Sequence, residues 1–310
     1  MTRRRSVGIM AVLAGLTLIC PAPVNSSLLP DLPDWTHIRF FGGGADFGTD
    51  VSQAGDVNGD GFDDAIVAGW AYESHEVENQ EGAAWVYAGS ADGLSVDAVW
   101  MYESNRPGAN FGLSADAAGD VNGDGYGDII IGAPGYKELA WAGPRGAAYV
   151  FHGSPDGLSL VPDAMFIPAF GQAQGFGQSV AGAGDINGDG YDDVAVGVGM
   201  HDPGDGVKRW VVFVYYGSAD GLVDDPDIVV PDENAKMNSI HVAAAGDVNG
   251  DGFADIIAGD AYYRNSETQE GAAFVYVGSP DGIDSTPIWD VRSDQPHQAW
   301  FAYRVAGAGD

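Results

Sequence analysis

The sequence predicts an all-β protein, a β-propeller of four-stranded antiparallel blades, and three observations point to this fold class. An acidic turn, first seen as "GDVNGDGFDD" from Gly55, returns from Gly119, Gly184 and Gly246. Short apolar segments rich in β-branched and aromatic residues lie between glycine-rich turns. No stretch keeps the 3.6-residue period of a helix, so a helical solenoid is excluded.

Each repeat contains four apolar segments in the same order. A segment of small residues such as "SVAGAGD" leads into the acidic turn, and an apolar run such as "AIVAG" follows it. A third segment such as "GAAWVYAGS" closes with a turn of the "GSADGL" type, and a fourth such as "AVWMYES" ends the unit. Four short strands joined by tight turns describe one propeller blade. We expect the small residues on a crowded innermost strand and the aromatic residues between blades, farther out.

The spacing of the acidic turns divides the chain. Their first aspartates, Asp56, Asp120, Asp185 and Asp247, are 64, 65 and 62 residues apart. We expect blades at about 47–110, 111–175, 176–237 and 238–300, with a partial repeat at 301–310, because "RVAGAGD" there repeats "SVAGAGD". Asp310 would open a fifth acidic turn. We therefore expect a fragment of a longer ring, since ring closure removes exposed strand edges.

Residues 1–26 have the pattern of a secretory signal peptide. A basic head with Arg3, Arg4 and Arg5 precedes an apolar run that ends at Cys20, and cleavage is expected after Ser26. The alternative is a membrane anchor, but the run is short for a bilayer. We expect a secreted, extracellular or cell-surface protein, with the periplasm as a further possibility. Residues 27–46 are expected to form an N-terminal segment with a ring-closing outer strand.

Charge and cysteine content exclude several function classes. The chain has 13 Lys and Arg against 45 Asp and Glu, a formal net charge of −32. This balance argues against nucleic acid and against membrane insertion or binding to anionic membranes after signal removal. Cys20 is the only cysteine, so the mature chain has no disulfide, thiolate zinc site or cysteine nucleophile. An exported domain without disulfides needs another constraint, and metal ions are the obvious candidate.

The acidic turns share the pattern D-x-N-x-D-G-x-x-D, which we call the acidic loop and number from its first Asp. Positions 1, 3, 5 and 9 offer side-chain oxygens, position 7 can offer its carbonyl, and Gly at position 6 allows a sharp bend. Calcium takes six to eight oxygen ligands, whereas magnesium retains more water, so calcium fits this set better. Four calcium ions are expected, one for each complete repeat.

Two other interpretations of the acidic loop are less favourable. An EF-hand requires a glutamate at position 12 and flanking helices, but position 12 falls in apolar runs, at Val67, Ile131, Val196 and Ala258. Ordinary turn formers would explain Asp, Asn and Gly, but position 8 serves as an internal control, because it varies as Asp63, Gly127, Asp192 and Ala254. Positions 1, 3, 5, 6 and 9 do not vary, and so many unneutralised carboxylates would repel one another.

From about Phe47 to Asp310 the chain resembles the FG-GAP repeats of the integrin alpha-chain propeller and its bacterial relatives. Phe-Gly elements stand at Phe47-Gly48, Phe111-Gly112 and Phe176-Gly177, and the complete Gly-Ala-Pro element at 132–134. The fourth repeat departs with "KMNSIHV", and the fifth has Phe301-Ala302. The resemblance implies a seven-bladed ring with calcium in the turn between the first two strands of a blade. The implied ligands are Asp56, Asn58, Asp60, the Phe62 carbonyl and Asp64; Asp120, Asn122, Asp124, the Tyr126 carbonyl and Asp128; Asp185, Asn187, Asp189, the Tyr191 carbonyl and Asp193; and Asp247, Asn249, Asp251, the Phe253 carbonyl and Asp255.

Strand order places the turns of a blade on two faces. Turns 1–2 and 3–4, the acidic loops and the "GSADGL"-type turns, share one nearly invariant face. Turns 2–3 and 4–1 lie on the other, which we call the variable face, and variable loops on a rigid scaffold commonly carry recognition. Aromatic candidates for ligand contact there are Trp70, Tyr72, Tyr136, Trp141, Trp210, Tyr262 and Tyr263. The alternative is that several of them only pack against neighbouring loops.

Two functional hypotheses follow. The first is a secreted calcium-binding propeller that acts as a binding or adhesion module for a protein or glycan on its variable face. The second is the propeller domain of a secreted hydrolase or lyase acting on polysaccharide or lipid, which predicts a separate catalytic domain beyond Asp310 or non-repeating carboxylates clustered near the axis. No catalytic residue and no organic cofactor is expected, because the chain has no G-x-S-x-G, H-E-x-x-H or phosphate-cradling motif.

Overall fold

The structure is a computed structural model of the 310-residue chain. It describes residues 12–13, 16–17, 46–73, 80–138, 143–169, 173–202, 206–230, 240–265, 268–293 and 300–308. The chain divides into two compact units, Met1–Ile38 and Arg39–Asp310. In the first unit β1 (Val12–Leu13) pairs with β2 (Leu16–Thr17). The rest of the predicted signal peptide and nearly all of segment 27–46 lie outside the described residues, as do Trp141 and Asp310.

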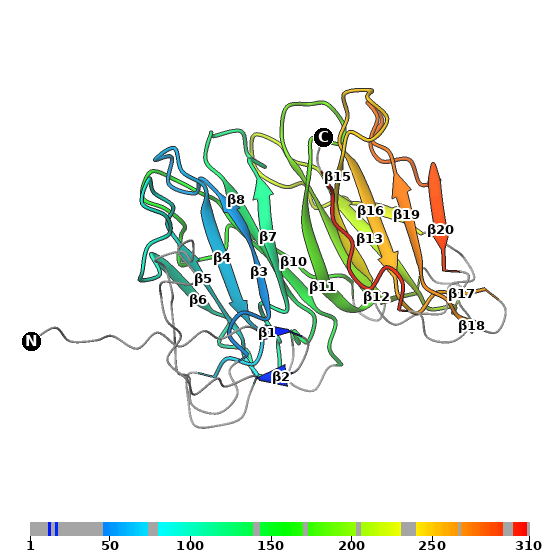
Figure 1. Cartoon of the computed structure of the whole chain (residues 1–310), viewed down its shortest axis with the longest axis horizontal. Coiled ribbons are helices and arrows are strands. Elements are labelled where there is room, and N and C mark those ends of the chain that lie inside the picture. The colour runs from blue at the N-terminus through cyan, green and yellow to red at the C-terminus, as the bar shows by residue number, and fades with distance from the viewer. Residues whose placement is uncertain are drawn as a thin grey trace, which may run out of the picture. The chain divides into compact units, whose positions relative to one another are not determined.

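Four four-stranded antiparallel sheets make up the described part of the second unit (Figure 1). The sheets are β3 (Asp50–Gly55), β4 (Asp64–Gly69), β5 (Ala83–Tyr87) and β6 (Trp100–Glu103); β7 (Ser114–Gly119), β8 (Asp128–Ala133), β9 (Ala147–Phe151) and β10 (Ala164–Phe166); β11 (Ala173–Gly184), β12 (Asp193–His201), β13 (Arg209–Tyr215) and β14 (Asp227–Val229); and β15 (His241–Gly246), β16 (Asp255–Asp260), β19 (Ala272–Tyr276) and β20 (Trp289–Arg292). No helix occurs in the described ranges. The predicted all-β fold with four-stranded blades is confirmed.

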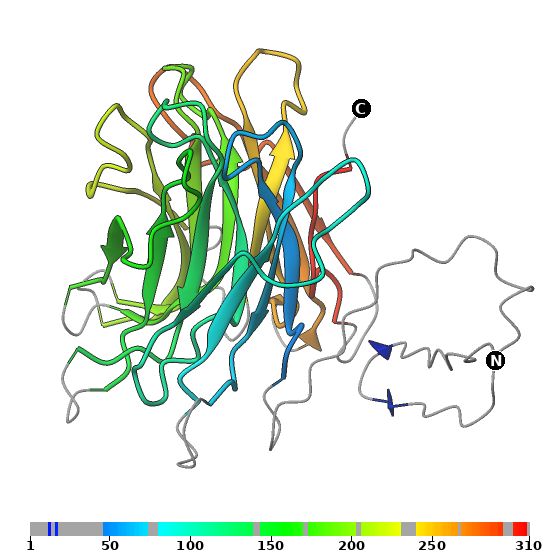
Figure 2. The ribbon, with the colours of Figure 1, turned by 90° about the vertical axis from the view of Figure 1, so that its left-hand side faces the viewer.

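The fourth blade carries one feature that the repeat pattern does not predict. Its second and third strands are connected through a two-stranded hairpin, β17 (Arg264–Asn265) and β18 (Thr268–Gln269). Elsewhere each sheet follows the simple order of four consecutive strands. The strands run between two sets of loops, which are seen at opposite ends of the sheets in Figure 2.

The first strands of the four blades lie next to one another, in the order β3, β7, β11 and β15. They carry the small residues, such as Ala118 and Ala181, both of which are buried. At one position not even the methyl group of Ala fits between the neighbouring sheets: a Cβ added to Gly182 would lie 2.3 Å from the carbonyl oxygen of Ala117 on the preceding blade. The predicted crowding of the innermost strand is therefore confirmed.

Aromatic side chains of the third and fourth strands fill the wider spaces between blades, as predicted. Trp100 on β6 packs edge-on against Phe151 on β9 of the next blade, with ring centroids 5.0 Å apart. Its indole Nε1–H donates a hydrogen bond of 2.8 Å to the Ser159 carbonyl oxygen. Phe166 and Tyr215 make the equivalent contact between the second and third blades at 4.3 Å.

The Phe-Gly element brings the main chains of two blades together. The Phe111 and Phe176 backbones each lie against a glycine that precedes the third strand of the preceding blade. A Cβ on Gly82 would lie 1.9 Å from the Phe111 carbonyl oxygen, and a Cβ on Gly146 would lie 2.1 Å from that of Phe176. Such distances are shorter than van der Waals contact, so these positions accept only glycine.

We predict that Gly146→Ala destabilises the fold more than Gly157→Ala. Both glycines have positive φ, 88° and 79°, which costs an alanine about 1–2 kcal/mol. A Cβ at Gly157 meets nothing within 4 Å, whereas one at Gly146 meets the Phe176 backbone. Forcing the two blades apart should add roughly 1–3 kcal/mol to the loss for Gly146→Ala. Urea unfolding of both variants measures the difference, and equal losses would show that the blades do not approach this closely.

Candidate functional site

The first half of each acidic loop is folded by hydrogen bonds from its own main chain. In the first loop Asp56 Oδ1 accepts the N–H of Asp60 at 3.0 Å, and Asp56 Oδ2 accepts that of Gly61 at 2.8 Å. Asn58 Oδ1 accepts the N–H of Asp60 at 2.8 Å, and Asp60 Oδ1 accepts that of Phe62 at 3.0 Å. The same four bonds occur in the other three loops. Positions 1, 3 and 5 are thus held in one turn of chain.

The aspartate at position 9 ties the acidic loop to its own blade. In the first blade Asp64 Oδ2 accepts the N–H of Val57 at 3.2 Å, and Asp64 Oδ1 accepts that of Gly89 at 2.7 Å. Gly89 begins the "GSADGL" turn after the third strand. Asp128, Asp193 and Asp255 make the same pair of bonds in their blades. One carboxylate therefore fixes the two turns that share the invariant face.

These four carboxylates are buried, and burial raises their pKa. The pKa values of Asp128 and Asp193 rise to about 7, and those of Asp64 and Asp255 rise above their ordinary value. The two amide hydrogen bonds lower each pKa, but the like charges at positions 1 and 5 raise it further. The negative charge at position 9 is therefore unfavourable unless a positive charge compensates it.

The acidic loop also contacts the next blade through its main chain. The carbonyl oxygen of position 1 accepts the N–H of position 8 on the following blade, as between Asp56 and Gly127 at 2.8 Å. The carbonyl of position 2 accepts the N–H of a turn serine there, as between Val57 and Ser154 at 3.0 Å. The equivalent bonds join the second loop to the third blade through Asp192 and Ser218, and the third loop to the fourth blade through Ala254.

The aromatic side chain at position 7 has a role that sequence reasoning missed. It lies over the position 4 glycine of the preceding loop: a Cβ on Gly123 would lie 2.7 Å from Tyr191, and one on Gly188 would lie 2.6 Å from Phe253. The prediction used only the carbonyl of position 7. The available signal was that position 4 is Gly and position 7 is Phe or Tyr in all four copies.

The donor set of the acidic loop suits a hard divalent cation, because its side-chain donors are all carboxylate or amide oxygens. A carboxylate oxygen that accepts one N–H keeps a second lone pair. Within the described ranges, however, no group of three or more His, Cys, Asp or Glu side chains is placed to hold a metal ion. The predicted calcium ligands therefore stay a prediction.

On the variable face, three of the aromatic candidates for ligand contact belong to the core. Tyr136, Trp210 and Tyr263 are buried. Tyr136 packs against Tyr149 and Tyr263 against Phe274 within their own blades, and Trp210 packs against Phe274 of the next blade. All three rings belong to core clusters shared by two blades. Trp70, Tyr72 and Tyr262 are half-buried and stay at the surface. The alternative interpretation, that several of these rings only pack, is correct for the first three.

The first strands carry a polar cluster that sequence reasoning did not single out. Six residues before position 1 of the acidic loop, the repeats have four kinds of polar side chain at five equivalent positions: Asp50, Ser114, Ser179, His241 and Arg304. With Ser52 and Asp116, which stand two residues further along β3 and β7, we call them the axial polar cluster. All seven residues line a cavity of about 290 Å³ between the first strands.

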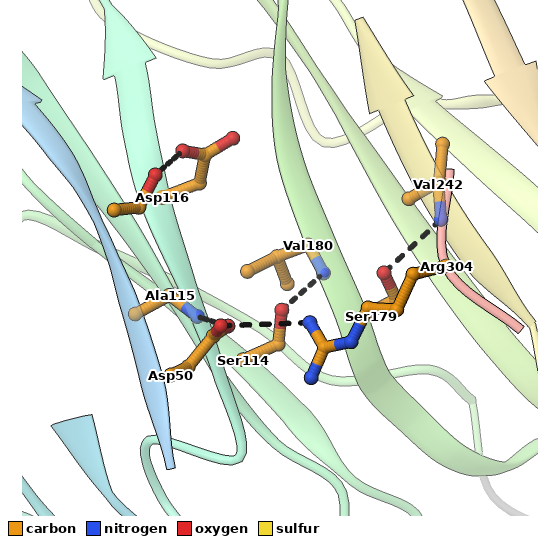
Figure 3. Close-up of polar contacts among 9 residues, drawn as sticks. Asp50, Ser114, Ala115, Asp116, Ser179, Val180, Val242 and Arg304 are labelled. Carbon is orange, nitrogen blue, oxygen red and sulfur yellow. Dashed lines mark hydrogen bonds and ion pairs between the residues drawn. The ribbon is translucent and has the colours of Figure 1, made fainter. Parts of the chain in front are cut away.

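Most members of the axial polar cluster bond to the neighbouring blade (Figure 3). Asp50 Oδ2 accepts the N–H of Ala115 at 3.0 Å, and the hydroxyl oxygens of Ser114 and Ser179 accept the N–H groups of Val180 and Val242, each at 3.1 Å. The Ser52 hydroxyl donates to Asp116. Arg304 Nη1 lies 3.6 Å from Asp50 Oδ1 and is largely exposed. Two non-repeating carboxylates, Asp50 and Asp116, therefore do lie on the first strands.

The fourth blade buries one further carboxylate, at the variable end of β16. Asp260 is fully buried, and its Oδ1 accepts the N–H of Tyr262 at 2.8 Å. Burial raises the pKa of Asp260 to about 6, against the lowering effect of the Tyr262 N–H and the Trp210 indole. The equivalent positions in the other blades are Gly69, Ala133 and Val198.

Four-stranded blades that each carry an acidic loop between the first two strands, and that pack through Phe-Gly elements, define a β-propeller built from repeats of one kind. The FG-GAP repeat model matches residues 47–87, 111–151, 176–212 and 241–276. The chain belongs to the FG-GAP repeat family. The described residues contain no helix long and apolar enough to cross a membrane.

Similar proteins include integrin alpha chains and a phospholipase. Integrin alpha-PS2 of Drosophila melanogaster is 35% identical over 154 residues, which is 46% of this chain and 11% of the integrin chain. Phosphatidylinositol-glycan-specific phospholipase D of Homo sapiens is 29% identical over 219 residues, 66% of this chain and 26% of the phospholipase. Integrin alpha-PS3 of Drosophila melanogaster is 32% identical over 191 residues, 59% of this chain and 16% of the integrin. The matched region is thus about a quarter or less of each relative.

We predict that Asp260 makes the unfolding free energy depend on pH. Because its folded pKa of about 6 lies above the ordinary 3.8, the folded state binds the proton more tightly. Its contribution to stability is complete below pH ~4 and is lost as the pH rises through about 6. Asp260→Asn should therefore gain up to roughly 3 kcal/mol relative to the parent chain between these two pH values. Urea unfolding at both pH values, in saturating calcium, measures this gain.

The matched control is Asp225→Asn, which removes the same charge from an exposed position. If Asp260→Asn and Asp225→Asn changed the pH profile alike, the buried carboxylate would not be the source of the dependence.

Proposed function

We propose that this chain is a secreted, calcium-binding β-propeller that serves as a binding or adhesion module. Its ligand would contact the variable face, which carries the 2–3 and 4–1 loops. The signal-peptide pattern supports export, and the similarity to integrin alpha chains supports a binding role. The ligand-contacting loops differ between repeats, whereas the acidic loops do not.

The observation that carries the calcium proposal is the fourfold repetition of one hydrogen-bonded frame around a buried carboxylate. Positions 1, 3, 5 and 9 form the same bonds in all four loops, and the pKa of the position 9 carboxyl is raised in each. Ordinary turns do not require two further carboxylates beside one buried carboxylate. A bound calcium ion would supply the missing positive charge.

The residues that would hold the ion are the oxygens at positions 1, 3, 5 and 9 and the carbonyl at position 7. Position 1 also accepts a main-chain hydrogen bond from the next blade, as Asp56 does from Gly127. An ion that fixes position 1 would therefore stabilise the interface between blades as well as its own hairpin. Since the unfolded chain lacks this arrangement, binding should raise stability.

The second candidate, a domain of a secreted hydrolase or lyase, has two observations in its favour. The chain is similar to a phospholipase D, and Asp50 and Asp116 lie on the first strands as non-repeating carboxylates. Both carboxylates, however, accept hydrogen bonds from neighbouring blades, Asp50 from Ala115 N–H and Asp116 from the Ser52 hydroxyl. This bonding is what a structural connection between blades requires, and it favours the binding module.

We predict that calcium removal lowers the melting temperature and that each acidic loop binds one ion. Asp60→Asn removes a position 5 carboxylate and should reduce the stoichiometry measured by equilibrium dialysis from four to three. Asp63→Asn removes a carboxylate from position 8 of the same loop, whose side chain is exposed, and should leave four. Calorimetric melting with and without chelator should show a smaller calcium-dependent shift for Asp60→Asn than for Asp63→Asn.

A melting curve of the parent chain that is the same with and without chelator would contradict the calcium proposal. Equal stoichiometry in the two variants would show that the position 5 carboxylate is not a ligand of the ion.

A further inference from the structure

We propose that a row of rings where the fourth blade meets the following partial repeat, together with the axial polar cluster beside it, forms a binding site for a neutral glycan. The row consists of Tyr262, Trp300, Tyr303 and His241, and we call it the aromatic row. This inference rests on the proposed function, because it places the ligand on the variable face and names its chemical class.

The aromatic row is continuous and faces solvent. The ring centroids of Tyr262 and Trp300 are 5.5 Å apart, those of Trp300 and Tyr303 are 5.7 Å apart, and those of Tyr303 and His241 are 5.4 Å apart. Trp300 is 48% exposed and Tyr303 is 46% exposed, and the other two rings are half-buried. A tight turn, with the Tyr303 N–H donating to the Trp300 carbonyl at 3.3 Å, presents the two central rings together.

The positions of Trp300 and Tyr303 are accessible to solvent in other repeats as well. Asn110 and Gly175 are equivalent to Trp300, and Leu113 and Gln178 to Tyr303. All four residues stay partly exposed although their blades have a neighbour on each side. The intervening phenylalanine differs, because Phe111 and Phe176 are fully buried. We therefore leave Phe301 out of the site.

Trp300 adopts a backbone conformation that a large side chain rarely takes. Its φ is 53°, and the equivalent residues with positive φ are Asp46, Asn110 and Gly175, which suit this conformation. Ala302 likewise has a φ of 58° where three other repeats have Gly. Positive φ in bulky residues persists where function requires the side chain. The turn itself does not require tryptophan.

The aromatic row leads into the cavity of the axial polar cluster. His241 belongs to both, and Arg304 follows Tyr303 directly. Burial, together with Arg304, lowers the pKa of His241 to about 4, so its imidazole is uncharged at neutral pH. Arg304 is 3.6 Å from Asp50 and largely exposed, which leaves guanidinium N–H groups for a ligand (Figure 3). The cavity thus offers a donor, an acceptor and a neutral ring side by side.

A sugar matches both halves of this arrangement. Its C–H face packs on aromatic rings, and its hydroxyl groups both donate and accept hydrogen bonds at the edge. Charge decides between sugar classes: a chain of net charge −32 repels uronates and sulfated glycans. The single exposed cation at the site, Arg304, is already paired with Asp50. A neutral oligosaccharide is therefore the ligand class that we assign.

The test measures binding of soluble oligosaccharides to the calcium-loaded chain by isothermal titration calorimetry. The probes are neutral hexaoses of glucose, mannose, xylose and galactose, with hexauronates and an arginine-rich peptide for comparison. We expect at least one neutral hexaose to bind, and Trp300→Ala to weaken it by roughly tenfold or more. Arg304→Gln should weaken it as well.

Trp289→Ala is the matched control. Trp289 is also 48% exposed and is also on the fourth blade, but it lies in the outer strand β20 away from the aromatic row. This variant should bind the hexaose like the parent chain. Far-UV circular dichroism and the calcium-dependent melting shift establish that each variant is folded.

The outcomes separate the inference from the proposed function. Failure of every neutral hexaose to bind, or equal binding by Trp300→Ala and the parent chain, overturns the glycan site. Binding of only the arginine-rich peptide, lost in Trp300→Ala, overturns the glycan assignment but leaves a binding module on the variable face. If the chain lost neither stability nor metal in chelator and bound none of the probes, the proposed function itself would be contradicted.

Discussion

One buried carboxylate per blade organises the invariant face. The aspartate at position 9 accepts one N–H from the acidic loop and one from the turn after the third strand, as Asp128 does from Val121 and Gly153. It thereby connects the first three strands of a blade at one end. Burial makes these hydrogen bonds strong, but it also disfavours the negative charge of the carboxylate that accepts them. The acidic loop is consequently the place where a cation would contribute most.

The connection extends from one blade to the next through main-chain atoms. Position 8 donates its N–H to the position 1 carbonyl of the preceding loop, whether it is Gly127, Asp192 or Ala254. Because the shared bond uses the main-chain N–H, the side chain at position 8 can vary, and in the third blade Asp192 Oδ2 adds a second bond by accepting the N–H of Asp120 at 2.8 Å. Position 4 must be glycine for the opposite reason, since the ring at position 7 of the next loop occupies the space of its Cβ. Loop and blade interface are therefore one structural unit.

The sequence allowed the blades, their strand order and the placement of small and aromatic residues to be predicted, because these follow from a pattern within one repeat. Contacts between repeats could not be derived in this way. Trp210 and Tyr136 were candidates for ligand contact because they lie near variable loops, yet they are buried between blades. Their burial depends on how two sheets pack, and periodicity within a repeat does not contain this information.

The axial polar cluster was not predicted from the sequence for a related reason. Each member, such as Asp50 or His241, is a single polar residue at the start of an otherwise small, apolar strand. Seen in one repeat, it looks like ordinary variation. The cluster exists only because the first strands lie side by side, which brings five equivalent positions around one cavity. Comparing equivalent positions across repeats, rather than motifs within them, would have found it.

The two ends of the first strand are under different constraints, and this difference is the basis for placing recognition at the variable end. At the acidic end every repeat keeps the same side chains, because each loop must satisfy the same amides. At the other end the position that is Ser in two blades is Asp, His or Arg in the others, and Ser114 and Ser179 show that a hydroxyl is enough to join two blades. A charged or aromatic residue there is more than the fold requires. The adjacent turn shows the same departure from what the fold requires, because Trp300 and Ala302 have backbone conformations that favour Gly or Asn. Where a repeat departs from the residue that its neighbours show to be sufficient, stability does not account for the choice, and the binding function that we propose would.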